Sequence, residues 1–160
     1  VSYVRQLWGE NARICVAAYP EVHPRARTPA EDLHAFREKV MAGATDAVTQ
    51  YFYNADAYLR FRDDAQALGV EIPLVPGIMP ISNYVQLSRF SDACGAEIPR
   101  WLRKRLEALQ DDIPALCDFG ADIVAQMCER LIGEGVPALH FYSMNRADLI
   151  REICTRLGWH

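Results

Sequence analysis

The fold is decided by the stretch Ile14-Cys15-Val16-Ala17-Ala18-Tyr19-Pro20-Glu21-Val22-His23-Pro24. Its first residues are apolar or small, and they predict a strand over 14–19 that is covered on both faces, as in a parallel sheet. The rest is a rigid polar loop, because two prolines restrict the backbone and cannot extend a sheet. Ligands of α/β proteins bind where such strands end. Tyr19, Glu21 and His23 are therefore candidate site residues, and the alternative is a solvated loop without function.

The same alternation of strand and helix recurs along the chain. We predict further strands over 47–53, 72–75 and 138–142. Helices are expected to end near Trp8 and to span 28–43, 54–68, 82–94, 99–109, 111–134 and 145–157, with Asn145 as the cap of the last. Four strand–helix units predict an α/β fold with a parallel sheet. Because a closed barrel needs eight units, the fold is either a small open doubly wound sheet or half of a barrel.

Composition favours one globular domain over residues 1–160. The chain has 51% hydrophobic residues and a net charge of −4, with its charges dispersed. It has no basic tract that would bind nucleic acid or an anionic membrane, and no apolar run near the ~20 residues of a membrane span. We therefore expect a cytoplasmic protein with a small-molecule or protein partner. Because the chain begins at Val1 rather than Met, we also expect that residues upstream of it are missing.

The cysteines and the isolated histidine predict no metal site. The five cysteines are odd in number and never spaced as C-x-x-C, which argues against a disulfide framework and a zinc site. We expect buried thiols at Cys15, Cys94, Cys117, Cys128 and Cys154. His140 lies inside a predicted strand and is expected to be a hydrogen-bonded core residue.

The standard nucleotide motifs are absent. Gly133, Gly135 and Ala138 fit G-x-G-x-x-A, but they follow a helix and precede a strand, the reverse of the dinucleotide fingerprint. Two polar residues stand out instead. Gln50 is an amide inside a predicted strand, which favours either a ligand contact or a structural hydrogen bond. Arg146 lies in the first turn of a helix, where its charge opposes the helix dipole, so it suits a carboxylate from a substrate or a neighbouring acid.

Four motifs in chain order resemble one family. They are Ala17–Pro24, Thr49–Phe52, Val75–Ile81 and His140–Arg146. Together they resemble methylenetetrahydrofolate reductases. The resemblance implies a (β/α)8 TIM barrel of which only the last four β/α units are present, a half barrel. It further implies a flavoprotein of one-carbon metabolism and methionine biosynthesis, which uses FAD and NADH or NADPH to reduce 5,10-methylenetetrahydrofolate to 5-methyltetrahydrofolate.

The resemblance also implies which positions bind ligands. The positions matching FAD contacts are Ala17, Tyr19, His23, Ala26, Asp32 and Lys39. Those matching folate contacts are Gln50, Gln86, Phe90 and Arg146. The chain departs from the family where Ala35 and Glu38 replace an asparagine and a basic residue, which predicts weaker adenine or phosphate contacts on that helix.

The resemblance places the catalytic groups outside this chain. In the family, the proton-donating glutamate and an aspartate near the flavin come from the first half of the barrel, so we assign no catalytic residue here, and Glu21 is not that donor. We expect negligible activity without the missing N-terminal half. The alternative is an inactive folding unit that forms a homo-oligomer through unpaired sheet edges. An independent flavodoxin-like domain would need a glycine-rich phosphate loop, which residues 19–24 do not provide.

Overall fold

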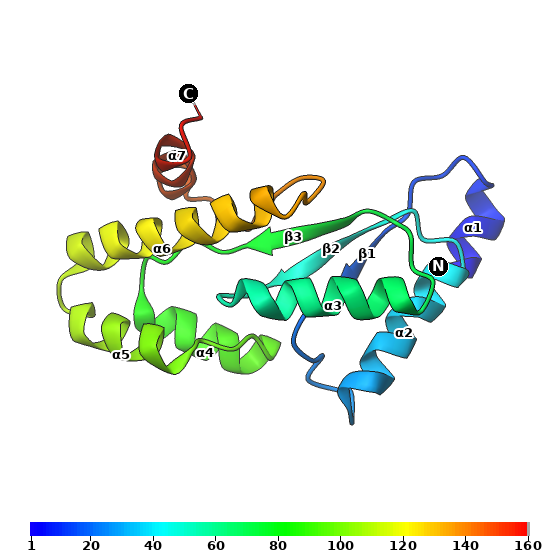
Figure 1. Ribbon diagram of the computed structural model, residues 1–160, viewed down its shortest axis with the longest axis horizontal. Helices are drawn as coiled ribbons and strands as arrows, with labels where there is room; N and C mark the ends of the chain where they lie inside the picture. The colour runs from blue at the N-terminus through cyan, green and yellow to red at the C-terminus, as the bar shows by residue number, and fades with distance from the viewer. Residues whose placement is uncertain (160) are drawn as a thin grey trace.

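The computed structural model describes residues 1–159 and is built around a four-stranded parallel sheet. The strands are β1 (Cys15–Ala18), β2 (Asp46–Tyr51), β3 (Leu74–Ile78) and β4 (His140–Phe141). The helices are α1 (Ser2–Trp8), α2 (Pro29–Met41), α3 (Ala55–Ala67), α4 (Tyr84–Cys94), α5 (Arg100–Leu109), α6 (Ile113–Gly133) and α7 (Ala147–Arg156). The strand arrows point toward the end of the molecule where α4 and α5 lie (Figure 1).

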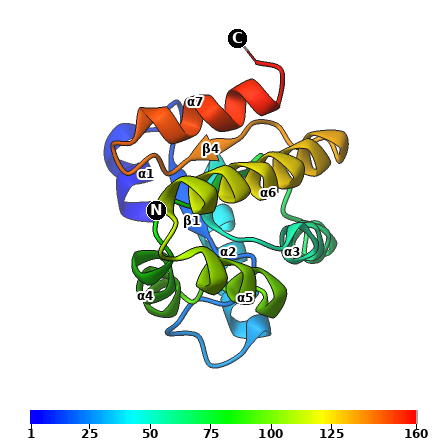
Figure 2. The ribbon, with the colours of Figure 1, turned by 90° about the vertical axis from the view of Figure 1, so that its left-hand side faces the viewer.

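The strands lie side by side in the order in which the chain makes them, and all three pairs are parallel. The helices follow the same order, since α2 packs on α3, α3 on α6 and α6 on α7 (Figure 2). A doubly wound sheet would reverse direction at a switch point, and this sheet has no such reversal within residues 1–159. The predicted α/β class and parallel sheet are confirmed, and closure into a barrel belongs to the proposal below.

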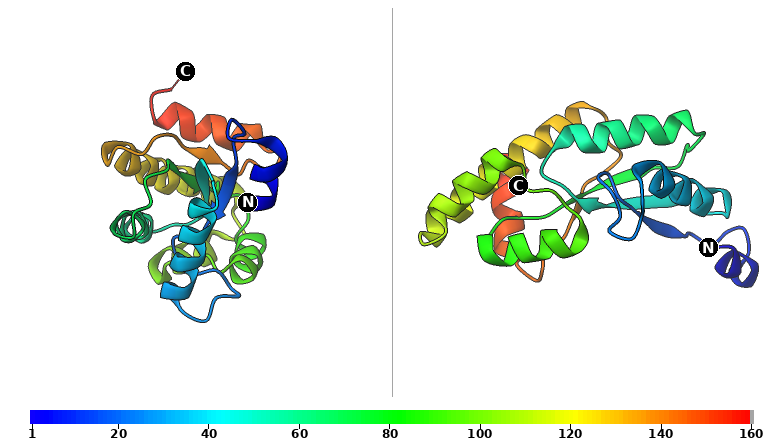
Figure 3. Two further views of the ribbon diagram at one scale, coloured as in Figure 1. Left: turned by 90° about the vertical axis from the view of Figure 1, so that its right-hand side faces the viewer. Right: turned by 90° about the horizontal axis from the view of Figure 1, so that it is seen from below.

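The prediction that the first strand is covered on both faces is wrong. Ala18 and its partner in register, Thr49, are fully buried. Their neighbours Ala17 and Val48, also paired, are exposed and half-buried. Alternate residues of a strand point to opposite faces, so one face of the sheet is packed and the other is open at β1. Figure 3 shows β1 with α2 and α3 to one side of the sheet.

The third strand passes through Pro76 and Gly77, which were predicted to end it. The register between β2 and β3 shifts between Val48 and Tyr51, and the Gly77 N–H donates to the Thr49 hydroxyl at 2.9 Å. This irregularity lets the strand continue past a proline that has no N–H to donate. The second strand is also shorter than predicted and ends at Tyr51.

Local start signals in the sequence set most helix ends. Thr28, Asn54, Asn83 and Asp112 each accept a hydrogen bond from a backbone N–H in the first turn of the following helix. The α4 helix ends at Gly95, whose φ of 73° is the left-handed conformation that glycine adopts most readily. The core joins the sheet to the inner faces of the helices, including Phe36, Tyr58, Phe61, Leu106, Leu116, Val124 and Ile153.

Three residue-level predictions are wrong. Of the five cysteines only Cys128 is buried, while Cys15 is exposed on the open face of β1. His140 is exposed because β4 is a two-residue strand at the edge of the sheet, and its ring contacts Tyr142 edge-on at 4.8 Å. Asn145 has a positive φ of 62° and does not cap α7, whose N-cap residue is Arg146.

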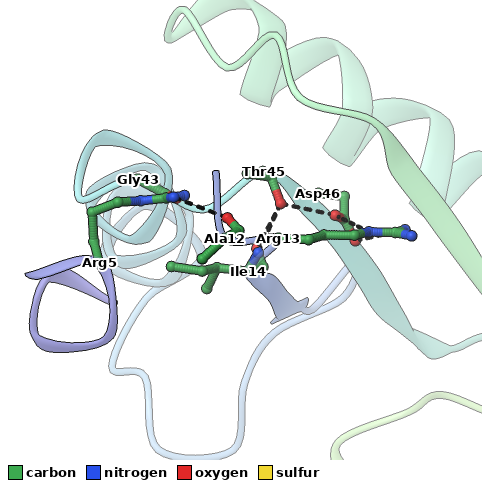
Figure 4. A network of polar contacts seen from close by, with 7 residues as sticks. All are labelled: Arg5, Ala12, Arg13, Ile14, Gly43, Thr45 and Asp46. Carbon is green, nitrogen blue, oxygen red and sulfur yellow. Dashed lines mark hydrogen bonds and ion pairs between the residues drawn. The ribbon is translucent and has the colours of Figure 1, made fainter. Parts of the chain in front are cut away.

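Polar contacts, rather than a core, attach α1 to the segments that precede β1 and β2 (Figure 4). No residue of α1 is buried. The Arg5 guanidinium donates to the carbonyl of Ala12 at 2.9 Å and to that of Gly43, while its buried Nε has no partner within the described residues. In the same network Arg13 pairs with Asp46 at 2.8 Å, and this hydrogen bond lowers the pKa of Asp46 to about 2.

Residues 1–159 contain no helix of the length and apolarity that crossing a membrane requires. Within the same residues, no three His, Cys, Asp or Glu side chains are arranged to hold a metal ion.

Candidate functional site

Strand β1, the loop after it and the helix α2 carry the six residues that were predicted to contact FAD. The Tyr19 and His23 rings meet edge-on at 4.4 Å. The Asp32 carboxylate accepts the His23 backbone N–H at 2.8 Å, and the Ala26 N–H donates to the His23 carbonyl at 2.9 Å. These bonds hold the loop over the N-terminal turn of α2. These contacts join four of the six residues, Tyr19, His23, Ala26 and Asp32, and their binding of FAD stays a prediction.

Lys39 connects the other end of α2 to β1. Its ammonium donates to the carbonyl of Ala17 at 3.0 Å. An ammonium has three donors, so two remain for a further acceptor. The carboxylate of Glu38 adds a negative charge next to the lysine in sequence. It is paired with the Arg37 guanidinium at 3.7 Å.

The His23 side chain has one donor free. Its Nδ1 accepts the backbone N–H of Arg25 at 3.0 Å. In the neutral ring the proton therefore lies on Nε2, which makes no hydrogen bond to the protein within the described residues. An imidazole N–H and a lysine ammonium are donors that suit an anionic ligand, and the small exposed Ala17 leaves room for a flat ring system, so these residues fit a flavin nucleotide.

A cavity of about 540 Å³ opens beside this loop, between α2, α3 and the α4–α5 connection. Tyr19, Glu21 and Asp32 line it from the β1 side, and Arg60 and Glu97 line it from the opposite side. The Glu21 carboxylate accepts the Glu97 backbone N–H at 2.6 Å. Burial raises the pKa of Glu21 to about 7, the hydrogen bond from the Glu97 backbone N–H opposes this rise, and the nearby Glu97 carboxylate adds to it.

A second cavity, of about 450 Å³, lies past the carboxyl ends of β3 and β4. Three of the four predicted folate contacts line it, namely Gln86 and Phe90 from α4 and Arg146 from the start of α7. Gln86 and Phe90 are four residues apart and so project from the same side of α4. The cavity thus combines an amide, an aromatic ring and a cation, which suits a ligand with a flat heterocycle and an anionic tail.

A buried tyrosine holds Phe90 in place. The Phe90 ring is 42% exposed and stacks on Tyr51 of β2, with 5.9 Å between centroids and 10° between planes. The Tyr51 ring is fully buried, and its hydroxyl is 2.9 Å from the hydroxyl of Ser91. Burial raises the pKa of Tyr51 to about 12, so the hydroxyl stays protonated. One face of Phe90 is therefore supported while the rest of the ring remains available for stacking.

Arg146 forms an ion pair with the neighbouring Asp148. Its guanidinium donates two hydrogen bonds to the Asp148 carboxylate, at 3.1 and 2.8 Å. This pairing raises the pKa of Arg146 and lowers that of Asp148. The preceding residues Met144 and Asn145 both have positive φ, of 47° and 62°. The strained turn brings Arg146 to the rim of the cavity, where half of its side chain remains accessible.

Gln50 is the predicted folate contact that the structure leaves outside this cavity. It is half-buried on β2, and its side-chain oxygen accepts the backbone N–H of the next residue, Tyr51, at 3.0 Å. Of the two alternatives for Gln50, a ligand contact or a structural hydrogen bond, the amide oxygen makes the structural hydrogen bond. The amide nitrogen makes no hydrogen bond within residues 1–159.

Two contributions were missed from the sequence. Tyr51 was predicted only as a strand residue, and its support of Phe90 joins positions 39 residues apart with no local pattern. The bond between Glu21 and the backbone of residue 97 was also missed. The sequence shows only that Glu21 belongs to a rigid loop at a strand end, and this does not indicate which residue would donate a hydrogen bond to its carboxylate.

Comparison with known proteins gives one family. The sequence matches the family model described as methylenetetrahydrofolate reductase over residues 1–158. It is 43% identical over 145 residues to the 5,10-methylenetetrahydrofolate reductase of Escherichia coli (strain K12), covering 91% of this chain and 49% of that protein. The 5,10-methylenetetrahydrofolate reductase of Buchnera aphidicola subsp. Schizaphis graminum (strain Sg) is 39% identical over 145 residues, covering 91% of this chain and 50% of that protein. The chain spans about half the length of these curated relatives.

One solved structure has a similar fold. It is described as an uncharacterized protein from Clostridium thermocellum that binds two copies of 5-methyl-5,6,7,8-tetrahydrofolic acid. The TM-score is 0.68 over 98% of this chain and 56% of that one, with 17% sequence identity. At this identity the likeness concerns the fold alone.

Proposed function

Because this chain belongs to the methylenetetrahydrofolate reductase family, we propose that it forms the folate- and flavin-binding half of an enzyme that reduces 5,10-methylenetetrahydrofolate to 5-methyltetrahydrofolate. NADH or NADPH is the proposed reductant. The observation that carries the proposal is the cavity in which Gln86, Phe90 and Arg146 converge from different parts of the chain.

Each of these three side chains has a distinct role in binding. Phe90, supported by Tyr51, stacks on the pterin ring. The Gln86 amide both donates and accepts, which matches the edge of a pterin. Arg146 retains donors beyond its pair with Asp148 and binds the anionic glutamyl end of the folate. The solved structure of similar fold, which binds a methyltetrahydrofolate, supports folate as the ligand class.

The loop after β1 and the helix α2 are the proposed FAD site. Tyr19 and His23, whose rings are in contact, would hold the cofactor's rings, and Lys39 would offer the point charge that a phosphate requires. When bound, FAD supplies the redox step by accepting a hydride and passing it on. The residues of this chain bind and orient the two ligands. The acid at Glu38 weakens the phosphate contact relative to a basic residue at that position.

The open face of the sheet supports a half barrel. In a closed parallel barrel, one face carries the helices and the other packs inside the barrel. Ala17 and Val48 lie on the face that this chain leaves uncovered at β1. We therefore propose that four further β/α units complete the barrel and bring the residues that transfer protons.

The test is binding of 5-methyltetrahydrofolate to the purified chain, measured by calorimetry. Phe90→Ala removes the stacking ring and is expected to weaken binding by about tenfold or more. Val85→Ala is the matched control, since Val85 is exposed on the same helix and does not line the cavity. Equal binding by the two variants and the unaltered chain would refute this folate site.

Activity tests the missing half. The chain alone is expected to show negligible reductase turnover with NADH or NADPH and added FAD. Turnover is expected to appear when the chain is mixed with the first half of the Escherichia coli relative. Turnover by the chain alone at the rate of an intact enzyme would contradict the assignment of catalysis to residues outside it.

A second candidate is a catalytically inactive unit that associates with copies of itself. It is favoured by the unpaired edges of β1 and β4 within residues 1–159. Flavin absorbance separates the two candidates. A yellow protein that retains FAD supports the enzyme half, and a colourless dimer that binds no folate supports the inactive unit.

A further inference from the structure

Two segments far apart in sequence are locked together between the proposed flavin and folate sites. One is the loop after β1, residues 20–24, and the other is the connection from α4 to α5, residues 95–98. The Glu21 carboxylate accepts the Glu97 backbone N–H at 2.6 Å. At Gly95 an added Cβ would lie 2.8 Å from the Val22 carbonyl oxygen and 3.1 Å from Pro24. A side-chain hydrogen bond therefore joins these segments, and at Gly95 the backbone lies so close to residues 22–24 that a Cβ would not fit.

Each segment leads directly to one of the two sites. Glu21 lies between Tyr19 and His23, whose rings contact each other on the flavin side. Gly95 ends α4, the helix that carries Gln86 and Phe90 into the folate cavity. The C-terminal half of α4 is held to the sheet through Tyr51, which contacts both Phe90 and Ser91. The bond from Glu21 anchors the turn that follows, so the orientation of α4 depends on the loop that bears the flavin contacts.

We infer that Glu21 is a positioning residue, which ties α4 and its folate-stacking Phe90 to the loop that holds the flavin. It does not touch the folate cavity, and it acts through the Glu97 backbone. The inference rests on the proposed function for its ligands, while the bond itself is independent of them. The other charged groups on the same cavity are Asp32 from α2, Arg60 and Asp64 from α3, and the Glu97 side chain. Within the described residues, none of them is hydrogen-bonded to the Glu21 carboxylate.

Two variants at one position separate the hydrogen bond from the charge. Glu21→Gln keeps an acceptor oxygen of the same reach, and Glu21→Ala removes it. Amide hydrogen exchange of the full chain is measured first, without ligand. In Glu21→Ala, exchange at Glu97 is expected to rise by about tenfold or more over the unaltered chain, because the hydrogen bond that protects this N–H is lost. Glu21→Gln is expected to restore most of the protection, and unchanged exchange in Glu21→Ala would overturn the inference.

Binding then tests the consequence for the folate site. The affinity for 5-methyltetrahydrofolate is expected to fall several-fold in Glu21→Ala and to be rescued in Glu21→Gln, and FAD is expected to raise folate affinity only where the bond is present. Faster exchange at Glu97 with unchanged folate affinity would show a merely structural bond and overturn the positioning role. If the unaltered chain itself binds no folate, the proposed function fails, and the exchange measurement still decides whether Glu21 holds the turn.

Discussion

Glu21 lies in the loop after β1, and Asp46 is the first residue of β2. The surroundings of these two carboxylates shift their pKa values in opposite directions. Glu21 is partly buried beside another acid, which raises its pKa to about 7. Asp46 accepts a hydrogen bond from Arg13, which lowers its pKa to about 2. Because a pKa that differs between the folded and unfolded chain makes stability depend on pH, each group has its own pH window.

For Glu21, ionisation is easier in the unfolded chain, where the pKa is near 4.5. The folded protein therefore binds more protons between pH 4.5 and about 7, and stability falls as the pH rises through this window. Glu21→Gln cannot ionise and lacks this decrease. Chemical denaturation from pH 4.5 to 8 is expected to show the variant gaining on the unaltered chain as the pH rises. A difference in the free energy of unfolding that stays constant with pH would contradict the raised pKa.

For Asp46 the sign is the opposite. Its folded-state pKa lies below the ordinary 3.8, so the stabilising contribution is complete above pH 4 and is lost as the pH falls toward 2. Asp46→Asn removes this dependence and is less stable than the unaltered chain at neutral pH. The two stability curves are expected to converge on acidification. Curves that remain parallel down to pH 2 would contradict an ionised pair between Arg13 and Asp46.

At the scale of the elements, β3 shows why a proline and a glycine do not end a strand here. Pro76 has no N–H, and the shift in register between β2 and β3 removes the need for one. Position 77 requires glycine because no other side chain fits between the neighbouring strands. An added Cβ would lie 2.2 Å from the Thr49 carbonyl oxygen and 2.6 Å from the Tyr142 ring, whose hydroxyl donates to the same oxygen at 2.9 Å.

Gly77→Ala is therefore expected to destabilise the protein by about 3 kcal/mol, because β2 and β4 must move apart. Gly133→Ala is the matched control. Gly133 is the last residue of α6, and a Cβ added there would meet no other atom. Alanine at this position is therefore expected to raise the free energy of unfolding by up to about 1 kcal/mol. Urea denaturation of both variants measures the difference. Similar unfolding midpoints for the two would contradict the close contact at Gly77.

At the scale of the whole molecule, helices cover one face of the sheet and the other face is open at β1. Cys15 and Ala17 are exposed on that open face, and the edge of β1 is unpaired within the described residues. On the adjoining helix α1, the side chains of Tyr3, Leu7 and Trp8 are 62–73% exposed. An unpaired edge next to exposed apolar side chains favours association with another chain.

Sedimentation velocity of the purified chain is accordingly expected to show association that increases with protein concentration. A mixture with the first half of the Escherichia coli relative is expected to replace self-association by a one-to-one complex, because the same edge is used for both. A monomer at all concentrations, in the presence and absence of that half, would refute the role of this edge.

The sequence by itself determined the order of strands and helices, the helix starts at Thr28 and Asn54, and the family. These features depend on residues a few positions apart, so a local pattern is enough to encode them. The six predicted flavin positions lie on β1, the loop after it and α2, which are consecutive in the chain.

Only the tertiary structure decided which face of β1 is open, that Phe90 rests on Tyr51, and that Glu21 holds the backbone of residue 97. It also separated Gln50 from the cavity that Gln86, Phe90 and Arg146 share. Each of these facts depends on what packs across a gap of tens of residues. Residues close in sequence favour a local backbone conformation, but the segments brought beside a side chain by folding decide whether it is buried, paired or free.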